Sequence, residues 1–248
     1  MVTADPDSLV TRLHEAAPPD QTHTVVIWTK NPKHLFTHPG LNACIQEYDQ
    51  RFLLYSITGL GGSALEPGVP KPEQAMAYLP DLVNLFQGPE RVRVRFDPIV
   101  HFMMPDEKKL CNLDFFSTLA PVLAENGIQH VITSWVEIYP KVKARLARHG
   151  ITAIEPTPAQ KETETRYLQE TAGQYGLNIH GCCMPGWPVN RCIDGHLLNL
   201  LHPKGLKTST RKAPGQRPLC GCTFSKDIGW YFSCPNGCLY CYGNPAKT

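Results

Sequence analysis

The chain has 248 residues, of which 42% are hydrophobic and 19% are charged, and its formal net charge is +2. This composition supports a folded core and gives no global reason to expect binding to nucleic acid or to an anionic membrane. No run of about 18 apolar residues is present, and the acidic, proline-containing N-terminus differs from a signal peptide. We therefore expect a soluble cytoplasmic protein with no membrane partner.

Runs of apolar, β-branched and aromatic residues recur along the chain and are typical of strands. The first, at 24–30, ends at Asn31-Pro32, and the second, at 52–59, ends in a glycine-rich turn. The run at 91–98 alternates strictly before it reaches a proline. Further strands are predicted at 130–138, 151–156, 177–183 and 228–233.

Helical patterns separate most of these runs. Apolar residues recur at helical spacing from 75 to 86, where Pro80 predicts a kink or two short helices, and again from 113 to 123. Helices are also predicted at 141–149, between a proline and a glycine, and from Thr157-Pro158 to about Gln174. Strands that alternate with helices predict parallel βα units, and hence a barrel or a doubly wound sheet.

Polar residues gather where the predicted strands end, which is the rim that carries the chemistry of βα barrels. Lys30 ends the first strand and precedes Asn-Pro, and Arg95 and Asp97 end the third. A turn-shaping Asp97 and a surface Arg95 are the simpler interpretations of those two residues. The run at 228–233 leads directly into cysteines, which we expect on the same rim as Lys30.

Ten cysteines are more than a reducing compartment usually leaves without a role, and clustered cysteines there indicate metal binding or catalysis. Cys44 and Cys111 are isolated, and we predict that both are small buried side chains. The other eight lie between 182 and 241.

The last three, Cys234, Cys238 and Cys241, have C-x3-C-x2-C spacing, with Tyr240 directly before the third. A disulfide, a zinc knuckle and an iron–sulfur cluster all remain open for such a triplet. A structural zinc site and a fully ligated 4Fe–4S cluster normally take four protein ligands. Three thiolates would leave one iron available to a small molecule.

This C-x3-C-x-aromatic-C pattern resembles the signature of the radical S-adenosylmethionine enzymes. The resemblance implies a 4Fe–4S cluster on Cys234, Cys238 and Cys241, S-adenosylmethionine on the open iron, and Tyr240 near its adenine. The segments at 24–32, 52–67 and 91–100 loosely resemble enzymes related to spore photoproduct lyase, which implies that Lys30 and Ser56 contact S-adenosylmethionine. Arg95, on the same rim, is a further candidate for cofactor binding.

The position of the triplet departs from that superfamily, which places it near the N-terminus, after the first barrel strand. A circular permutation that makes 228–233 the first barrel strand would account for the difference. The whole pattern resembles a bacterial family noted for a radical-type cysteine cluster at the C-terminus. We therefore expect an α/β fold, a partial (β/α) barrel of the TIM type in permuted form. Residues 1–181 would form the βα units, and 182–248 the cysteine-rich C-terminal segment with the last barrel strand and the cluster loop.

A second set of thiols precedes the triplet. Four ligands are predicted for an auxiliary iron–sulfur cluster or a zinc ion: Cys182, Cys192, Cys220 and Cys222. Adjacent residues on a strand point to opposite sides, so one of Cys182 and Cys183 could ligate while the other faces the core, and Cys182 is preferred. Free thiols and a redox-active disulfide are the alternatives. The stretch 195–226 has six basic residues and no acidic one, which indicates a solvated loop or a surface for a phosphate-bearing partner.

The predicted function is that of a radical S-adenosylmethionine enzyme which abstracts hydrogen from an unknown substrate. Its expected electron donor is a flavodoxin or ferredoxin, and a nucleic-acid substrate is a less favoured expectation. No residue is assigned to catalysis. The alternative is a non-enzymatic zinc- or iron–sulfur-binding module that contacts nucleic acid or protein.

Overall fold

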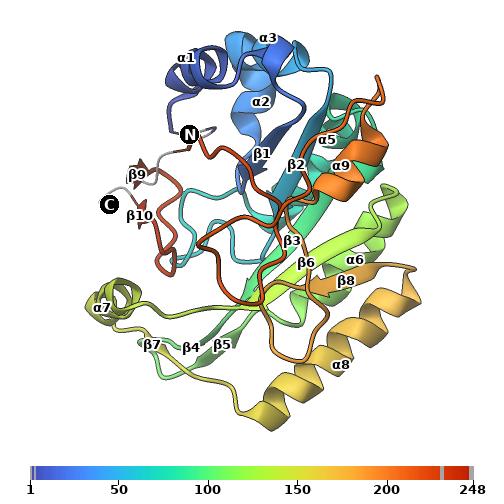
Figure 1. The fold of residues 1–248 in the computed structure, drawn as a ribbon. Helices are drawn as coiled ribbons and strands as arrows, with labels where there is room; N and C mark the ends of the chain where they lie inside the picture. The colour runs from blue at the N-terminus through green and yellow to red at the C-terminus, as the bar shows by residue number, and fades with distance from the viewer. Residues whose placement is uncertain (1, 3, 230–231, 246–248) are drawn as a thin grey trace.

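A five-stranded parallel sheet forms the centre of the computed structural model, which describes residues 2, 4–229 and 232–245 (Figure 1). The strands lie in the order β1-β2-β3-β6-β8, so their order in the sheet follows the chain. All four pairings are parallel. The strands are β1 (Val25–Thr29), β2 (Arg51–Ser56), β3 (Val92–Ile99), β6 (His130–Trp135) and β8 (Asn178–Gly181).

Helices connect and cover these strands, as the alternating pattern predicts. They are α1 (Pro6–Ala16), α2 (Lys33–Thr37), α3 (Pro39–Gln46), α4 (Pro72–Ala77), α5 (Leu79–Leu85), α6 (Phe115–Glu125), α7 (Pro140–Arg148), α8 (Pro158–Gln174) and α9 (Gly195–Leu201), with short 3-10 turns η1 (Pro19–Gln21) and η2 (Pro89–Arg91). Pro80 falls at the start of α5, and the pattern at 75–86 is indeed two short helices. Thr157 caps α8 through a capping box with Gln160, which confirms the predicted start of that helix.

The prediction that the run at 151–156 belongs to the parallel sheet is wrong. Its ordered part, β7 (Thr152–Ala153), pairs antiparallel with β4 (His101–Met103), which also pairs with β5 (Lys109–Cys111). These strands form a separate three-stranded sheet beside the main one. A short apolar run does not show which strand it will pair with, and here β4 and β7 bury Phe102 and Ile151 against α7.

The predicted strand at 228–233 lies partly outside the described residues, because 230 and 231 are not among them. Its described end, β9 (Phe232–Cys234), pairs in parallel with β10 (Asn244–Pro245) and not with the five-stranded sheet. The fold is therefore a mixed α/β structure with an unclosed sheet and a cysteine-rich C-terminal region.

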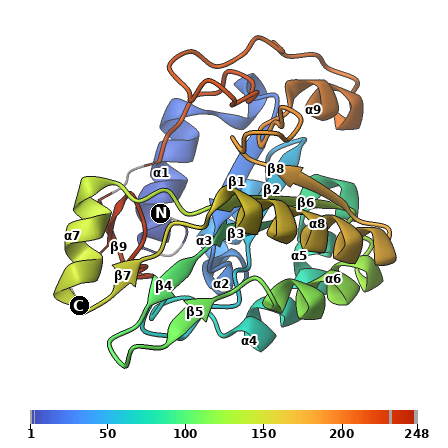
Figure 2. The same ribbon diagram turned by 90° about the horizontal axis from the view of Figure 1, so that it is seen from below.

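The two faces of the sheet have different cover because side chains alternate along each strand. One face, with Leu53, Val94 and Val131, belongs to the main core formed with the helices. The opposite face, with Phe52, Leu54 and Ile132, packs against Cys192 and Leu198 of the cysteine-rich segment. Figure 2 shows this segment and α9 on the side of the sheet away from α4 and α6. We call this second side the inner face. No helix among the described residues is long and apolar enough to cross a membrane.

Candidate functional site

The loop that carries the last three cysteines, residues 234–241, lies against the loop that follows β2. The amide of Gly68 donates to the Asn236 carbonyl at 3.0 Å, and the amide of Leu239 donates to the Leu65 carbonyl at 3.0 Å. A Cβ atom on Gly68 would lie 2.3 Å from the carbonyl oxygen of Pro235. Only glycine therefore allows this close approach of the two backbones.

Arg145 on α7 binds the same loop at its C-terminal end. Its Nη1 donates to the carbonyls of Leu239 at 3.0 Å and Cys241 at 2.8 Å, and its Nη2 donates to the Gly243 carbonyl at 3.2 Å. Three carbonyl acceptors on one planar guanidinium determine the path of the chain around Cys241. Arg145 thus holds the cysteine loop in place from the side opposite Gly68.

Cys234, Cys238 and Cys241 differ in exposure. Cys238 is buried, whereas Cys234 and Cys241 are half-buried. Burial raises the pKa of Cys238 to about 12, against the opposing effect of the nearby Lys30 ammonium. Turn hydrogen bonds join the Cys234 carbonyl to the Gly237 amide and the Cys238 carbonyl to the Cys241 amide, so the three thiols belong to one compact loop.

Lys30 anchors a buried polar network beside that loop. Its Nζ lies 2.6 Å from Oε1 of Glu66 and 2.9 Å from the hydroxyl of Tyr240, which itself donates to Glu66. Thr58 Oγ1 donates to the same carboxylate at 2.9 Å. Glu66 is 0% exposed. The network joins the ends of β1 and β2 to the cysteine loop.

The charge of Lys30 is retained in this environment. Burial is the largest single effect and favours the neutral amine, but Glu66 and the other anionic groups nearby together outweigh it and raise the pKa of Lys30. Cys238 and Asp97 act in the same direction. The structure therefore places a fixed cation beside the buried thiol of the triplet.

Tyr240 and Ser56, the other two residues expected to contact S-adenosylmethionine, are both buried. The Tyr240 ring lies 6.4 Å from that of Phe102, and its hydroxyl belongs to the Lys30 network. Ser56 ends β2, in register with Arg95 of β3. Lys30, Ser56 and Tyr240 thus gather at the carboxyl end of the sheet, as the strand ends predict.

Arg95 points across the inner face toward the second set of cysteines. Its Cζ lies 4.0 Å from the ring centroid of Trp28, and its Nη2 donates to Asp97, which also accepts from Ser134. Burial opposes its charge, but Asp97 and then the thiols Cys192 and Cys182 raise the pKa of Arg95. Arg95 and Asp97 therefore lie between the two cysteine groups.

The four predicted ligands of the second set do come together. Cys192 Sγ lies 3.8 Å from Cys182 Sγ. Side-chain contact with Cys192, aided by the Ile193 amide and Cys220, lowers the pKa of Cys222 to about 5. Arg217 adds a cation at 3.7 Å from Cys182 Sγ and pairs with Glu137 at 3.1 Å. Two loop segments align these thiols. The Gly221 amide donates to the Asn190 carbonyl, and the Thr223 amide donates to the Ile193 carbonyl.

Three other cysteines complete the ten. Cys183 is half-buried with a left-handed φ of 55° and interacts with Cys182, whereas it is Cys182 that contacts Cys192. Cys44 is buried, which confirms that prediction. The prediction for Cys111 is wrong, because Cys111 is exposed. It lies on β5, the edge strand of the small sheet, whose outer side meets solvent.

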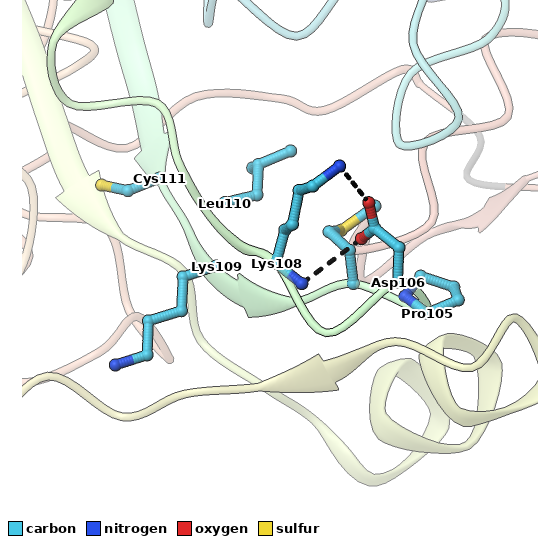
Figure 3. A pocket seen from close by; sticks show the side chains of 7 residues that line it. Pro105, Asp106, Lys108, Lys109, Leu110 and Cys111 are labelled. Atoms are coloured by element: carbon cyan, nitrogen blue, oxygen red, sulfur yellow. Dashed lines mark hydrogen bonds and ion pairs between the residues drawn. The ribbon is translucent and has the colours of Figure 1, made fainter.

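A shallow surface hollow of about 580 Å³ lies at the turn between β4 and β5, and none of the cysteines of the two groups lines it. Figure 3 shows that its side chains pair with one another, since Asp106 binds both the amide and the ammonium of Lys108. Lys108 and Asp106 are largely exposed. The hollow therefore offers little beyond a solvated loop, and the sheet end is the stronger candidate site.

Sequence reasoning missed two residues that organise the site. Glu66 follows a glycine-rich turn, and its Glu-Pro step is noticeable, but nothing in the pattern shows that Lys30 is its partner 36 residues away. Arg145 lies on a basic amphipathic helix and looks like any solvated arginine. Both depend on long-range packing, which a single sequence does not display.

Fold and site together define an α/β protein with two cysteine groups at one end of an open parallel sheet. The chain belongs to the family described as DUF1848, a domain of unknown function, which matches residues 8–243. No curated protein and no solved structure matches the chain.

Proposed function

We propose that this protein is a radical S-adenosylmethionine enzyme whose 4Fe–4S cluster is held by Cys234, Cys238 and Cys241. The observation that carries the proposal is the contact of the cysteine loop with the Lys30–Glu66 network at the carboxyl end of a parallel sheet. A purely structural metal knuckle has no need of a buried lysine, carboxylate and tyrosine at its base. Chemistry in βα folds is concentrated at this end of the strands.

The residues present fit the proposed group. Three thiols in one loop supply the soft ligands that iron–sulfur clusters require, and no fourth cysteine follows in the loop. The Oδ1 atom of Asn236 is buried in the loop without a hydrogen-bond partner among the described residues, so the loop has an unused acceptor next to its thiols. When bound, the cluster and S-adenosylmethionine would supply one-electron chemistry that ends in abstraction of a hydrogen atom from substrate.

The chain's own residues would bind and shield this chemistry. Lys30 offers a fixed cation for the anionic surroundings of the cluster or for a carboxylate, and the Tyr240 hydroxyl and Glu66 hold it in position. Ser56 and Arg95 line the same end of the sheet as further cofactor contacts. Trp28 is 51% exposed on the inner face and is available for stacking with a planar ring.

The second set of thiols would hold an auxiliary cluster or a zinc ion through Cys182, Cys192, Cys220 and Cys222. Zinc is supported by the separation of 3.8 Å between Cys182 Sγ and Cys192 Sγ, since ligands in a tetrahedral thiolate site lie roughly 3.8 Å apart. A cluster is supported by the spread of the whole set, because no three of these described thiols lie within 4.8 Å of one another. Four irons require their ligands to stand farther apart than one ion does, so we favour the cluster.

The substrate and the electron donor are not identified by these residues. A flavodoxin or ferredoxin remains the proposed donor, and the exposed cations of the loop at 204–217 suit an acidic protein or a phosphate-bearing substrate. The second candidate function is a non-enzymatic metal-binding module. The zinc-like spacing of Cys182 and Cys192 favours it, and the Lys30 network counts against it.

The test uses protein that is purified and reconstituted with iron and sulfide in the absence of oxygen. It is reduced with dithionite and given S-adenosylmethionine, and 5′-deoxyadenosine is measured by chromatography. Cys238→Ala should abolish the product, whereas Cys111→Ala, an exposed cysteine outside both groups, should leave it unchanged. A protein that retains zinc, takes up no iron and forms no product would refute the enzyme and favour the module.

A further inference from the structure

We propose that α1 and α3 together form a separate binding site for a divalent transition metal, Zn²⁺ by ligand chemistry, made of His14, Cys44 and Glu47. These helices lie side by side in Figure 1, away from the sheet end that carries the two cysteine groups. His14 is in the last turn of α1, Cys44 is in α3, and Glu47 follows α3 directly. The inference does not depend on the proposed radical chemistry.

The two distances from His14 to the other ligand atoms match those around a single tetrahedral ion. His14 Nε2 lies 3.5 Å from Cys44 Sγ and 3.1 Å from Glu47 Oε2, and all three atoms lie within 4.8 Å of one another. Around a tetrahedral zinc ion, sulfur and nitrogen ligands stand roughly 3.5 Å apart, and nitrogen and oxygen ligands roughly 3.4 Å apart. Each of the two distances from His14 is thus within a few tenths of an ångström of the value that an ion requires.

The donor set selects the kind of metal. One thiol, one imidazole and one carboxylate suit zinc and similar transition metals, whereas Mg²⁺ and Ca²⁺ prefer oxygen ligands only. The side chains of His14 and Glu47 are 45% and 49% exposed, so solvent can supply the fourth ligand. Cys44 is buried beneath them and closes the site from the protein side.

An ordinary surface ion pair does not account for this arrangement equally well. An exposed pair such as His14–Glu47 contributes little to stability and does not require a thiol at its base. Cys44 is placed one turn before Glu47 on the same helix face, so its sulfur and the carboxylate converge on the same imidazole. Three different donor types from two helices thus point to one position.

A bound ion would fasten α1 to α3, and α1 in turn contacts the segment that joins the two cysteine groups. Lys226 Nζ donates to the Ala16 carbonyl at 2.6 Å, and Arg12 Nη1 donates to the Ile228 carbonyl at 3.2 Å. The ion would therefore stabilise the end of α1 on which residues 226–228 rest. Its role in this proposal is structural.

The experiment measures zinc bound per full-length chain after equilibrium dialysis against excess zinc, by elemental analysis. It compares the unaltered protein with His14→Ala and Glu47→Gln, which change exposed side chains and should not disturb folding. Each should bind one zinc less per chain and show a smaller rise in melting temperature with zinc. His149→Ala, which removes an exposed histidine at the end of α7, is the matched control and should bind as much zinc as the unaltered protein.

Cobalt identifies the ligand set. A Co²⁺ difference spectrum between the unaltered protein and Glu47→Gln should contain a near-ultraviolet thiolate-to-cobalt band. The Co²⁺ spectrum of Cys44→Ser should lack this same band. Equal zinc content in the unaltered protein and His14→Ala would overturn the proposal. If the band that Glu47→Gln removes is still present in Cys44→Ser, the proposal is also overturned, because the thiol would then come from another site.

Discussion

The Lys30–Glu66 pair should be the most sensitive polar contact of the fold, and Lys30→Met tests this directly. The substitution keeps the length of the stem but removes the ammonium 2.6 Å from a fully buried carboxylate. Among the described residues, Glu66 would then keep the hydroxyls of Thr58 and Tyr240 as donors. Breaking a buried pair by removing one partner costs about 3–5 kcal/mol, because the remaining charge stays desolvated.

A second substitution separates this cost from the loss of packing. Glu66→Gln alone should cost less, about 2 kcal/mol, since the Lys30 side chain is 18% exposed and its ammonium can gain water. Lys30→Met combined with Glu66→Gln should be more stable than the sum of the single changes predicts, with a coupling of about 2 kcal/mol. Tyr240→Phe, which removes one hydrogen bond to a charged group, should cost about 1.5–3 kcal/mol.

The assay is urea unfolding followed by circular dichroism, with all variants held in the same metal-loaded state. Unfolding curves with unchanged slopes allow the free energies to be compared. Single and double changes that add to within about 0.5 kcal/mol would refute the reasoning, because independent sites behave in that way. The pair would then be only a surface-like contact at the sheet end.

Three further predictions follow from single contacts. Arg145→Gln should leave global stability nearly unchanged but speed alkylation of Cys241, since it frees three carbonyls of the cysteine loop. Arg148→Gln, on the exposed side of α7, should not change the alkylation rate. Equal rates in the two variants would argue against this role of Arg145. Gly68→Ala should lower the iron retained by the triplet at least several-fold, because the new Cβ would lie 2.3 Å from the Pro235 oxygen. Gly173→Ala on α8 is the control, because a Cβ there meets nothing within 4 Å. Equal iron in both variants would contradict the predicted clash. Hydrogen bonds with Cys111 and Glu164 raise the pKa of His101 to about 9, so about 1–2 kcal/mol of stability should be present below pH 6.5 and lost as the pH rises through about 9. His101→Gln should remove that dependence from urea titrations at several pH values, and an unchanged profile would place its origin elsewhere.

The strands of the parallel sheet could be predicted from the sequence because each is an apolar run bounded by turn residues. The apolar runs that correspond to β1, β2 and β3 end at Asn31-Pro32, at Gly59 and at a proline. The structure has strands at these three places, and their order in the sheet follows the chain. Pairing partners were not open to prediction. The run at 151–154, with an isoleucine at each end, resembles a sheet strand, yet Thr152 and Ala153 pair with β4, because the chain after β3 turns into a second small sheet.

The candidate site was predictable in its residue types and not in its connections. Cysteine spacing identifies thiols that can share a metal, and strand ends locate Lys30 and Arg95, because both follow local rules. The partner of Lys30 lies 36 residues away, and Arg145 reaches the loop across 94 residues. Such contacts depend on how β2, α7 and the C-terminal loop pack together, which no local pattern encodes.

Charge on the inner face bears on the proposed metal at the second set of thiols. Arg93 and Arg95 alternate along β3, so both buried guanidinium groups face the cysteine-rich segment, and burial lowers the pKa of Arg93. Asp194 and Asp97 pair with one nitrogen of each group. The Nε atoms of both arginines have no oxygen or nitrogen partner among the described residues. Each buried cation has one carboxylate partner, and thiolates bound to a metal would add anionic charge beside the guanidinium nitrogens that the carboxylates leave unpaired, which neutral thiols would not. The arginines thus favour a metal-bound second set over free thiols, independently of the spacing of its cysteines.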